Sequence, residues 1–408
     1  MDSLTQIVLG AATGEVVLGR KAGNRAMLFG AVAGTIPDLD ILANLFCDDM
    51  TALAFHRGIS HSFFFAVTAP MAFAWLTHKM YDSGIYLRRG FRMGALISWI
   101  LLAALIAFGL NMIPVMTAGS PSTGFLAGSV LALGGLGWWL HRVYLKRPVS
   151  EVDLQWKDWY WLYFWAILTH PLLDCCTAYG TQVFQPFSDY RVAWNNISVA
   201  DPIYTFPFLI CVIIAARFTR EHRLRRVFNY VGIGLSCLYM AYTVYNKFKV
   251  NAAFEKTLAN KQIDYQRYMT SPTIFNNLLW HCIAEGDSVY YQGLYSVLDK
   301  RPDIDKIRIV PKNRYFLKGH ATDEDIKTLE WFSNGYYNVI KRPDGKLQFN
   351  DLRYGFVGDR EPTADDFVFR FILVTDEESG EFKALEDRNR NFKEEDLQAF
   401  RQRMMGVE

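Results

Sequence analysis

The sequence predicts a mainly α-helical protein, with a polytopic membrane domain at residues 1–248 and a soluble α+β domain at residues 249–408. Two observations support this fold class. Apolar runs long enough to cross a bilayer recur along the first part, and short β-branched and aromatic runs follow them. Of the 408 residues, 51% are hydrophobic, yet the mean hydropathy is close to zero. A membrane-embedded part averaged with a polar part gives such values.

The apolar runs predict about six to eight membrane segments, since a spanning helix needs ~20 residues. They lie at 3–19, 26–42, 62–78, 93–113, 124–140, 157–173, 202–216 and 227–245. The first run lacks a preceding basic region and a small-residue cleavage site, so we expect a retained span and not a signal peptide. The second is interrupted by Pro37, Asp38 and Asp40, which predicts a broken or re-entrant helix.

Basic residues between the runs predict the orientation of the membrane domain. They cluster in four connections, at 20–25, 79–92, 142–147 and 217–226. The positive-inside rule places all four connections in the cytoplasm. This topology puts the stretches PDLD (37–40), HRGISHS (56–62) and HPLLD (170–174) together on the outer face, and it places the C-terminal domain outside the cytoplasm.

Residues after about 250 have the pattern of a soluble α+β domain. Runs rich in β-branched and aromatic residues, bounded by Gly, Pro and Asp, predict strands at 288–296, 306–310, 336–342 and 366–375. Polar helical patterns lie at 251–268, 322–333 and 394–405. We find no internal repeat in the sequence.

Charge and cysteine content argue against two classes of protein. A net charge of +2 argues against a strongly basic surface, so no stable nucleic-acid binding is expected. The six cysteines contain no CxxC pair and no closely spaced framework, which argues against a disulfide scaffold. Cys175 and Cys176 follow Asp174 and could supply a soft ligand, but we expect them to be small buried hydrophobic residues.

The HPLLD stretch predicts a pair of metal ligands on one helix. His170 and Asp174 are four residues apart, so on a helix they share one face and can hold one ion together. The alternative is a polar cap at the helix end, with Pro171 only shaping the turn. An ionisable group at membrane depth is costly and normally marks function.

The HRGISHS stretch predicts two further ligands. His56 and His61 are five residues apart and would face different ways on a straight helix, but Gly58 permits a turn that points both at one centre. Neutral imidazole is a common zinc ligand, and Ser60 or Ser62 could hydrogen-bond to the histidines from behind. Polar anchoring at the membrane interface is the alternative for these histidines.

The PDLD stretch contributes a carboxylate. Asp38 and Asp40 are two residues apart, so in extended backbone they point to opposite sides and only one needs to bind the ion directly. We predict that Asp38 is the ligand.

Together, a polar residue before a Gly-rich first helix, PDxD, HRGxSHS and HPxxD resemble the YdjM-like membrane-bound metal-dependent hydrolases, over about residues 1–215. The resemblance implies that Asp38, His56, His61, His170 and Asp174 belong to a metal centre, with Asp40 close by. Many members have a histidine in the opening segment where this chain has Gln6. The Asp-bearing and HxxxD motifs are also distantly similar to zinc-dependent phospholipase C proteins.

A carboxylate and imidazole site with an open position lowers the pKa of bound water, so the expected reaction is hydrolysis with a divalent metal ion, zinc above others. At the outer membrane boundary, the expected substrate is a phosphoester or a lipid-linked molecule. Asp40, Arg57 and Arg191 are the candidate catalytic side chains, the arginines as partners of a phosphate. Snorkelling or salt-bridged arginines are the alternative.

Two other functional classes stay open. One is a non-catalytic membrane scaffold stabilised by metal, whose C-terminal domain binds a protein partner. The other is an ion-linked transporter that uses the broken segment at 26–42, although this class predicts inverted repeats. We expect the protein in a bacterial inner membrane, in contact with lipid, with the metal site facing outside the cytoplasm. The sequence does not define an oligomeric state.

Overall fold

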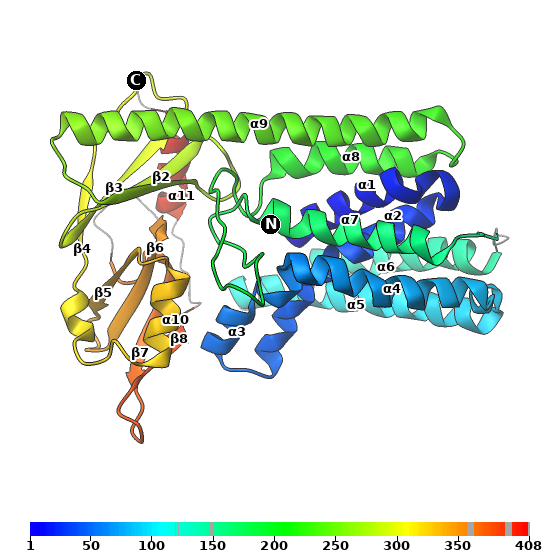
Figure 1. The fold of residues 1–408 in the computed structure, drawn as a ribbon, viewed down its shortest axis with the longest axis horizontal. Helices are drawn as coiled ribbons and strands as arrows, with labels where there is room; N and C mark the ends of the chain where they lie inside the picture. Colours follow the sequence, from blue (N-terminus) through cyan, green and yellow to red (C-terminus); the bar gives the residue numbers. More distant parts are fainter. Residues whose placement is uncertain (119, 121, 147–150, 357–362, 388–393, 407–408) are drawn as a thin grey trace. The chain divides into compact units, whose positions relative to one another are not determined.

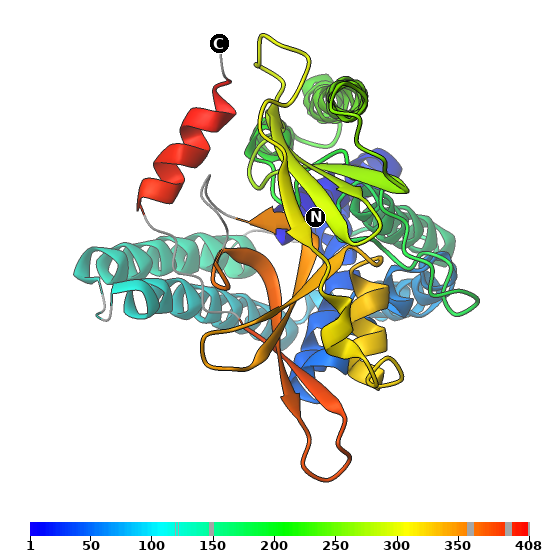
Figure 2. The same cartoon turned by 90° about the vertical axis from the view of Figure 1, so that its left-hand side faces the viewer.

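The computed structural model describes residues 1–118, 120, 122–146, 151–356, 363–387 and 394–406 (Figures 1 and 2). It contains two compact units: one joins Met1–Pro70 with Trp161–Glu408, and the other is Met71–Tyr160. Arg147, from one of the predicted cytoplasmic connections, lies outside the described residues. The predicted domain boundary at residues 248 and 249 falls inside one long helix.

Every apolar run of the sequence forms a helix. The helices of this part are α1 (Ser3–Ala22), α2 (Asn24–Thr35), η1 (Pro37–Leu45), α3 (Asp49–Phe55), η2 (Ile59–His61), α4 (Phe63–Asp82), η3 (Ile85–Leu87), α5 (Arg89–Ala118), α6 (Thr123–His141), η4 (Arg142–Lys146), α7 (Trp156–Asp174), α8 (Pro202–Arg217) and α9 (Arg223–Asn260). The broken segment predicted at 26–42 is the pair α2 and η1, bent by 46°. Pro37 begins η1, where its missing N–H leaves no helical hydrogen bond unmade.

Among the described residues, three helices are long and apolar enough to cross a membrane: α5, α6 and α9. The number rises to five if each of two bent helix pairs counts as one span. This is fewer than the predicted six to eight. Helix α8 is short, with 16 residues, while α1 is rich in Gly, Ala and Thr and α7 in Trp and Tyr, which lowers their hydropathy.

Helices α1 and α2 pack unusually closely because small residues line their contact. A Cβ built on Gly10 would lie 2.3 Å from the carbonyl oxygen of Gly30, and one on Gly14 would lie 2.1 Å from that of Ala26. The same holds for Gly34, whose Cβ would lie 2.6 Å from the backbone oxygen of Gln6. Glycines and alanines four residues apart permit such backbone contact between membrane helices. The close packing places the end of α2 beside the start of α1.

A buried ion pair ties α1 and α2 to α8 and α9 at the opposite end. Arg225 donates from Nε and Nη2 to the two carboxylate oxygens of Glu15, at 2.8 and 2.5 Å. Its Nη1 donates to Asn24 Oδ1 and to the carbonyl oxygen of Phe218. The contact joins the basic connections at 20–25 and 217–226, as expected for two loops on the same side of a membrane.

The unit Met71–Tyr160 is built around α5 and α6, which pack on each other. Asn111 Nδ2 donates to Ser129 Oγ across the pair at 2.7 Å, and Trp99 Nε1 donates to Tyr144 Oη at 2.8 Å. Most of the apolar side chains of both helices are exposed, which fits a surface covered by lipid.

The C-terminal part contains two four-stranded antiparallel sheets, which lie in the foreground of Figure 2. The first has the order β1 (Arg267–Pro272), β2 (Leu279–Glu285), β3 (Val289–Ser296), β4 (Arg308–Pro311); the second has the order β5 (Tyr337–Lys341), β6 (Leu347–Phe356), β7 (Phe367–Thr375), β8 (Phe382–Glu386). The remaining helices are η5 (Arg314–Leu317), α10 (Glu324–Phe332) and α11 (Glu394–Met404). The four predicted strands are confirmed as β3, β4, β5 and β7. The helix predicted at 251–268 ends earlier, at the end of α9.

Each sheet is covered by a helix. The end of α9 packs Val250, Phe254 and Leu258 against Trp280 and Cys282 of the first sheet. The second sheet packs against α10 and also against α3, whose Met50 joins its core. The C-terminal part is therefore held to the segment that separates η1 from η2.

Candidate metal centre

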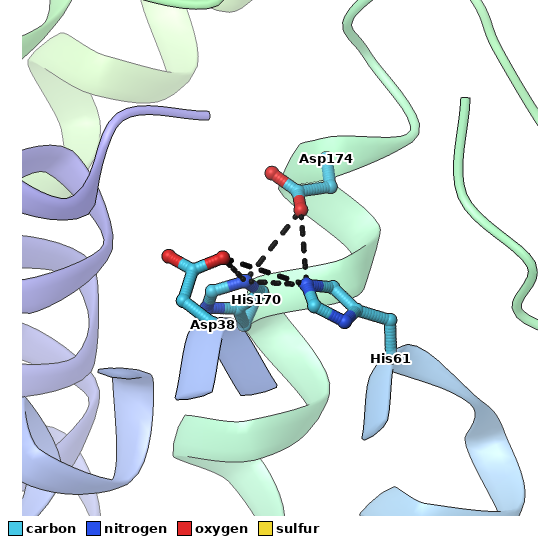
Figure 3. A group of neighbouring side chains, drawn as sticks. All are labelled: Asp38, His61, His170 and Asp174. Atoms are coloured by element: carbon cyan, nitrogen blue, oxygen red, sulfur yellow. Dashed lines mark hydrogen bonds and ion pairs between the residues drawn. The ribbon is translucent and has the colours of Figure 1, made fainter. Parts of the chain in front are cut away.

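Three segments bring four ligand-type side chains together at the end of α7 (Figure 3). Asp38 lies in η1, His61 ends η2, and His170 and Asp174 lie in the last turns of α7. The four-residue spacing of the α7 pair places both on one helix face, as the sequence predicts. One ligand atom from each residue lies within 4.8 Å of the other three.

The ligand atoms form a tight group. His61 Nε2 and His170 Nε2 are 3.1 Å apart. Asp38 Oδ1 lies 3.6 Å from the first and 3.4 Å from the second of these nitrogens. Asp174 Oδ2 lies 3.5 Å from each of them. Bonds to zinc of ~2.0–2.2 Å give a tetrahedron with edges of about 3.3–3.6 Å. These five of the six separations lie close to that range, and all six are within 4.8 Å, so the group can hold a divalent ion.

The hydrogen bonds behind the two histidines define their tautomers. His170 Nδ1 lies 2.6 Å from the carbonyl oxygen of Gly34, which can only accept, so Nδ1 carries the proton. His61 Nδ1 lies 3.3 Å from Asp40 Oδ2 and 3.1 Å from Ser60 Oγ. When both rings are neutral, both Nε2 atoms therefore carry lone pairs that face each other across 3.1 Å. A cation between them relieves this repulsion, and such backing hydrogen bonds are typical of metal-binding histidines.

Asp174 is oriented by its own partners. Its Oδ1 accepts from Gln6 Nε2 at 3.0 Å and from the amino group of Met1. Its Oδ2 is buried and accepts no hydrogen bond among the described residues, although Arg57 Nε lies 3.2 Å away. The oxygen that faces the two histidines is therefore left for a ligand. Gln6, which stands where the family resemblance implies a histidine in many members, is in this chain a hydrogen-bond donor to the site.

His56 and Asp40 lie beside the four-residue group and not in it. His56 Nδ1 bonds to Asp40 Oδ1 at 2.8 Å, and the His56 and His61 rings are 6.2 Å apart. Asp40 also accepts from the backbone N–H of Arg57 at 2.8 Å. The structure thus brings together four of the five predicted ligands, and it places Asp40 behind His61. Cys175 and Cys176 are buried, and neither is part of the group.

Arg57 makes the turn that the sequence assigns to Gly58. The backbone of Arg57 is left-handed, with φ of 56°, whereas Gly58 has φ of −90°. Gly58 is required for another reason, since a Cβ there would lie 2.7 Å from the carbonyl oxygen of Phe55. The buried Arg57 side chain donates to Thr177 Oγ1 at 2.9 Å and lies over the Tyr179 ring. Its guanidinium group therefore links Asp174 to the loop after α7.

Arg191 is held by the C-terminal part. It donates to the carbonyl oxygens of Phe332, at 2.9 Å, and of Tyr179, and its guanidinium carbon lies 4.5 Å from the centre of the Phe332 ring. Burial lowers the pKa of Arg191 to about 10. These contacts make the loop after α7 a bridge between Asp174 and the C-terminal sheets. A role for Arg191 on a phosphate stays a prediction.

Access to the group is one-sided. The side chains of His61, His170 and Asp174 have no exposed surface, whereas that of Asp38 is 21% exposed. Any molecule that approaches the ligand atoms therefore passes Asp38.

The helices and this buried group define an integral membrane protein with a candidate metal site at the ends of its helices. A family model described as "YdjM inner membrane protein" matches residues 1–117 and 122–250, more than half of the chain. The chain belongs to this family, as the motifs predict. The similarity to zinc-dependent phospholipase C proteins is not shown by the comparisons. No curated protein and no solved structure matches the chain.

Proposed function

We propose that this protein is an integral-membrane hydrolase that holds a divalent metal ion, zinc above others, at Asp38, His61, His170 and Asp174. The observation that carries the proposal is the convergence of two imidazole Nε2 atoms, 3.1 Å apart, with a buried carboxylate oxygen that accepts no hydrogen bond from any described residue. Such acceptors are costly to bury, and the only described cationic side chain paired with this oxygen is Arg57, whose Nε lies 3.2 Å away. A bound cation compensates all of them.

The ion, when bound, would act as a Lewis acid that activates water near neutral pH. The protein's own residues shape the site around it. Gln6 and Arg57 fix the two oxygens of Asp174 from one side. Asp40 and the Gly34 carbonyl fix the histidine rings from the other. The partly exposed Asp38 is where a substrate and water can enter.

A phosphoester is the substrate that these surroundings favour. The buried Arg57 guanidinium beside the ligand group is suited to a phosphate, because arginine matches phosphate oxygens in geometry and charge. Phosphoester bonds are abundant at a membrane surface, as lipid headgroups. We propose that the site and the C-terminal domain, residues 249–408, face outside the cytoplasm.

A structural metal site is the second candidate, and one observation favours it. Four protein ligands fill a tetrahedral coordination shell, as in structural zinc sites, whereas catalytic zinc usually has three protein ligands and a water. In that case the ion would hold η1 and η2 to the end of α7 and would leave no position for a substrate.

Metal analysis combined with a panel of phosphoester substrates separates the two candidates. We expect the purified protein to carry bound metal and to hydrolyse at least one phosphoester, and we expect His170→Ala and Asp174→Ala to lose both properties. His141→Ala, an exposed histidine at the end of α6, is the matched control and should retain both.

Bound metal without hydrolysis of any substrate, together with a large fall in Tm on chelation, would favour the structural site. Hydrolysis that persists after complete removal of metal would contradict the proposed function.

A further inference from the structure

We propose that the outward side of η1 is the binding surface for the hydrocarbon chain of the substrate, which makes the substrate a membrane lipid whose phosphoester headgroup reaches Asp38. This inference rests on the proposed function and specifies the substrate class of that site. The evidence is that Asp38, the partly exposed member of the ligand group, lies on η1, and that most exposed side chains of η1 are apolar.

The geometry of η1 places Asp38 at the edge of this surface. In a 3₁₀-helix, side chains three residues apart lie above one another. Pro37 and Asp40 form the inward row and are buried. Asp38 therefore begins the next row, in which Ile41 follows one turn later and is 59% exposed. The accessible edge of the ligand group thus continues directly onto an apolar side chain.

The third row of η1 widens the apolar surface. It consists of Leu39, Leu42 and Leu45, of which Leu42 is 50% and Leu45 72% exposed, and Phe46 follows at 86%. We refer to Leu39, Ile41, Leu42, Leu45 and Phe46 as the η1 apolar surface. Five large apolar side chains within eight residues, beside the one partly exposed carboxylate of the ligand group, are not suited to admit a small ionic substrate from water.

The surroundings of η1 favour a lipid chain as the occupant. Helices α2 and η1 together are apolar enough to form a membrane segment, bent by 46° between Thr35 and Pro37. The η1 apolar surface is therefore the continuation of a membrane segment beyond a bend. The inward row, in contrast, contains Asp40, whose carboxylate supports His61. A chain lying on the outward rows would place its polar headgroup at Asp38, next to Arg57 and Asp174.

Paired substrates test the inference. A soluble aryl phosphodiester and the same phosphodiester with an 18-carbon chain, presented in nanodiscs, differ only in the chain. We expect the double variant Ile41→Ser, Leu42→Ser to lower kcat/KM for the long-chain substrate by about tenfold or more, while the soluble substrate changes by less than about twofold. The matched control is Ile210→Ser, Ile213→Ser on α8, with 56% and 53% exposed side chains, which should change neither value.

Equal losses on both substrates would overturn the inference, because they would indicate a damaged metal site and not a lost chain contact. No loss on the long-chain substrate would overturn it as well.

A second readout does not depend on turnover. A long-chain phosphodiester with a photoactivatable diazirine in its chain should crosslink to residues 39–46 of the wild-type protein, as mapped by mass spectrometry, and less to the double variant. Crosslinking that is spread evenly over lipid-exposed helices such as α8 would overturn the chain-binding surface. If the protein crosslinks at 39–46 but hydrolyses neither substrate, the proposed function fails while the lipid-binding surface stands.

Discussion

Replacing Asp40 with asparagine should weaken metal binding by 10- to 100-fold without removing a ligand, if the buried group holds an ion. The Asp40 side chain is fully buried, and its Oδ2 accepts from the Arg57 backbone at 2.8 Å and from Ser60 Oγ and His61 Nδ1 at 3.3 Å each. Its Oδ1 accepts from His56 Nδ1 at 2.8 Å. Asparagine has the same shape, but only one of its two terminal atoms can accept.

The magnitude follows from these contacts. The variant is expected to keep its carbonyl oxygen where three donors converge and to turn its amide nitrogen towards His56, whose other tautomer can accept. The bond to His61 then loses its charge-assisted strength, since hydrogen bonds to an ionised acceptor are roughly twice as strong as neutral ones. Losses behind a metal-binding histidine typically cost 10–100-fold in affinity, or about 1.4–2.7 kcal/mol.

Competition with a chromophoric chelator, on protein in nanodiscs, measures this affinity directly. Asp48→Asn is the matched control: Asp48 caps α3 by accepting from Met50 and Thr51, and asparagine caps equally well. A dissociation constant for Asp40→Asn within about threefold of wild type would refute the idea that Asp40 supports His61 as a ligand.

Three further predictions concern the scaffold. Gly30→Val should lower the free energy of unfolding by about 1–3 kcal/mol or more, because its Cβ would lie 2.2 Å from the Gly10 carbonyl oxygen and push α2 away from α1. Tm and metal affinity should fall together, and an unchanged Tm would contradict the close packing. Arg225→Met should destabilise the protein by about 3–5 kcal/mol and Arg225→Met with Glu15→Leu much less, as thermal unfolding would show, since only the single variant leaves a buried charge unpaired; equal losses would contradict this reading. A cysteine at Arg223 should resist a membrane-impermeant thiol reagent added to intact cells, in a background without Cys47 and Cys237, whereas one at Glu378 should react; the reverse pattern would invert the proposed topology.

The helices were predictable because each apolar run has a length and composition that a membrane imposes. Strand β2 was not, since all seven of its residues are buried and it shows no alternation of polar and apolar side chains. The true length of α9 was also missed, because its last turns face a sheet and not lipid. Their polar pattern resembled the start of a separate domain.

The pairing of His170 with Asp174 follows from helix geometry alone, so the sequence was sufficient for it. That His61 belongs to the ligand group and His56 does not could not be predicted from their spacing. It depends on the left-handed backbone of Arg57 and on Asp40, which bonds to both histidines. Gln6 could be recognised only after folding, since its partner Asp174 lies 168 residues further along the chain.

Helix α9 sets the rotation of the first sheet about the helix axis relative to α1, because it contacts both. Its 38 residues span about 57 Å, well beyond the ~30 Å of a bilayer core. Near its start, Asn229 bonds to the backbone of Ala12 in α1, and further along Lys247 bonds to Thr270 in the first sheet. One residue inserted between these two points would turn the sheets by about 100° around the helix axis. The contacts of Arg191 and Met50 with the C-terminal part could not then form. The number of residues between Asn229 and Lys247 is therefore as important for the position of the loop after Asp174 as the side chains that contact this loop.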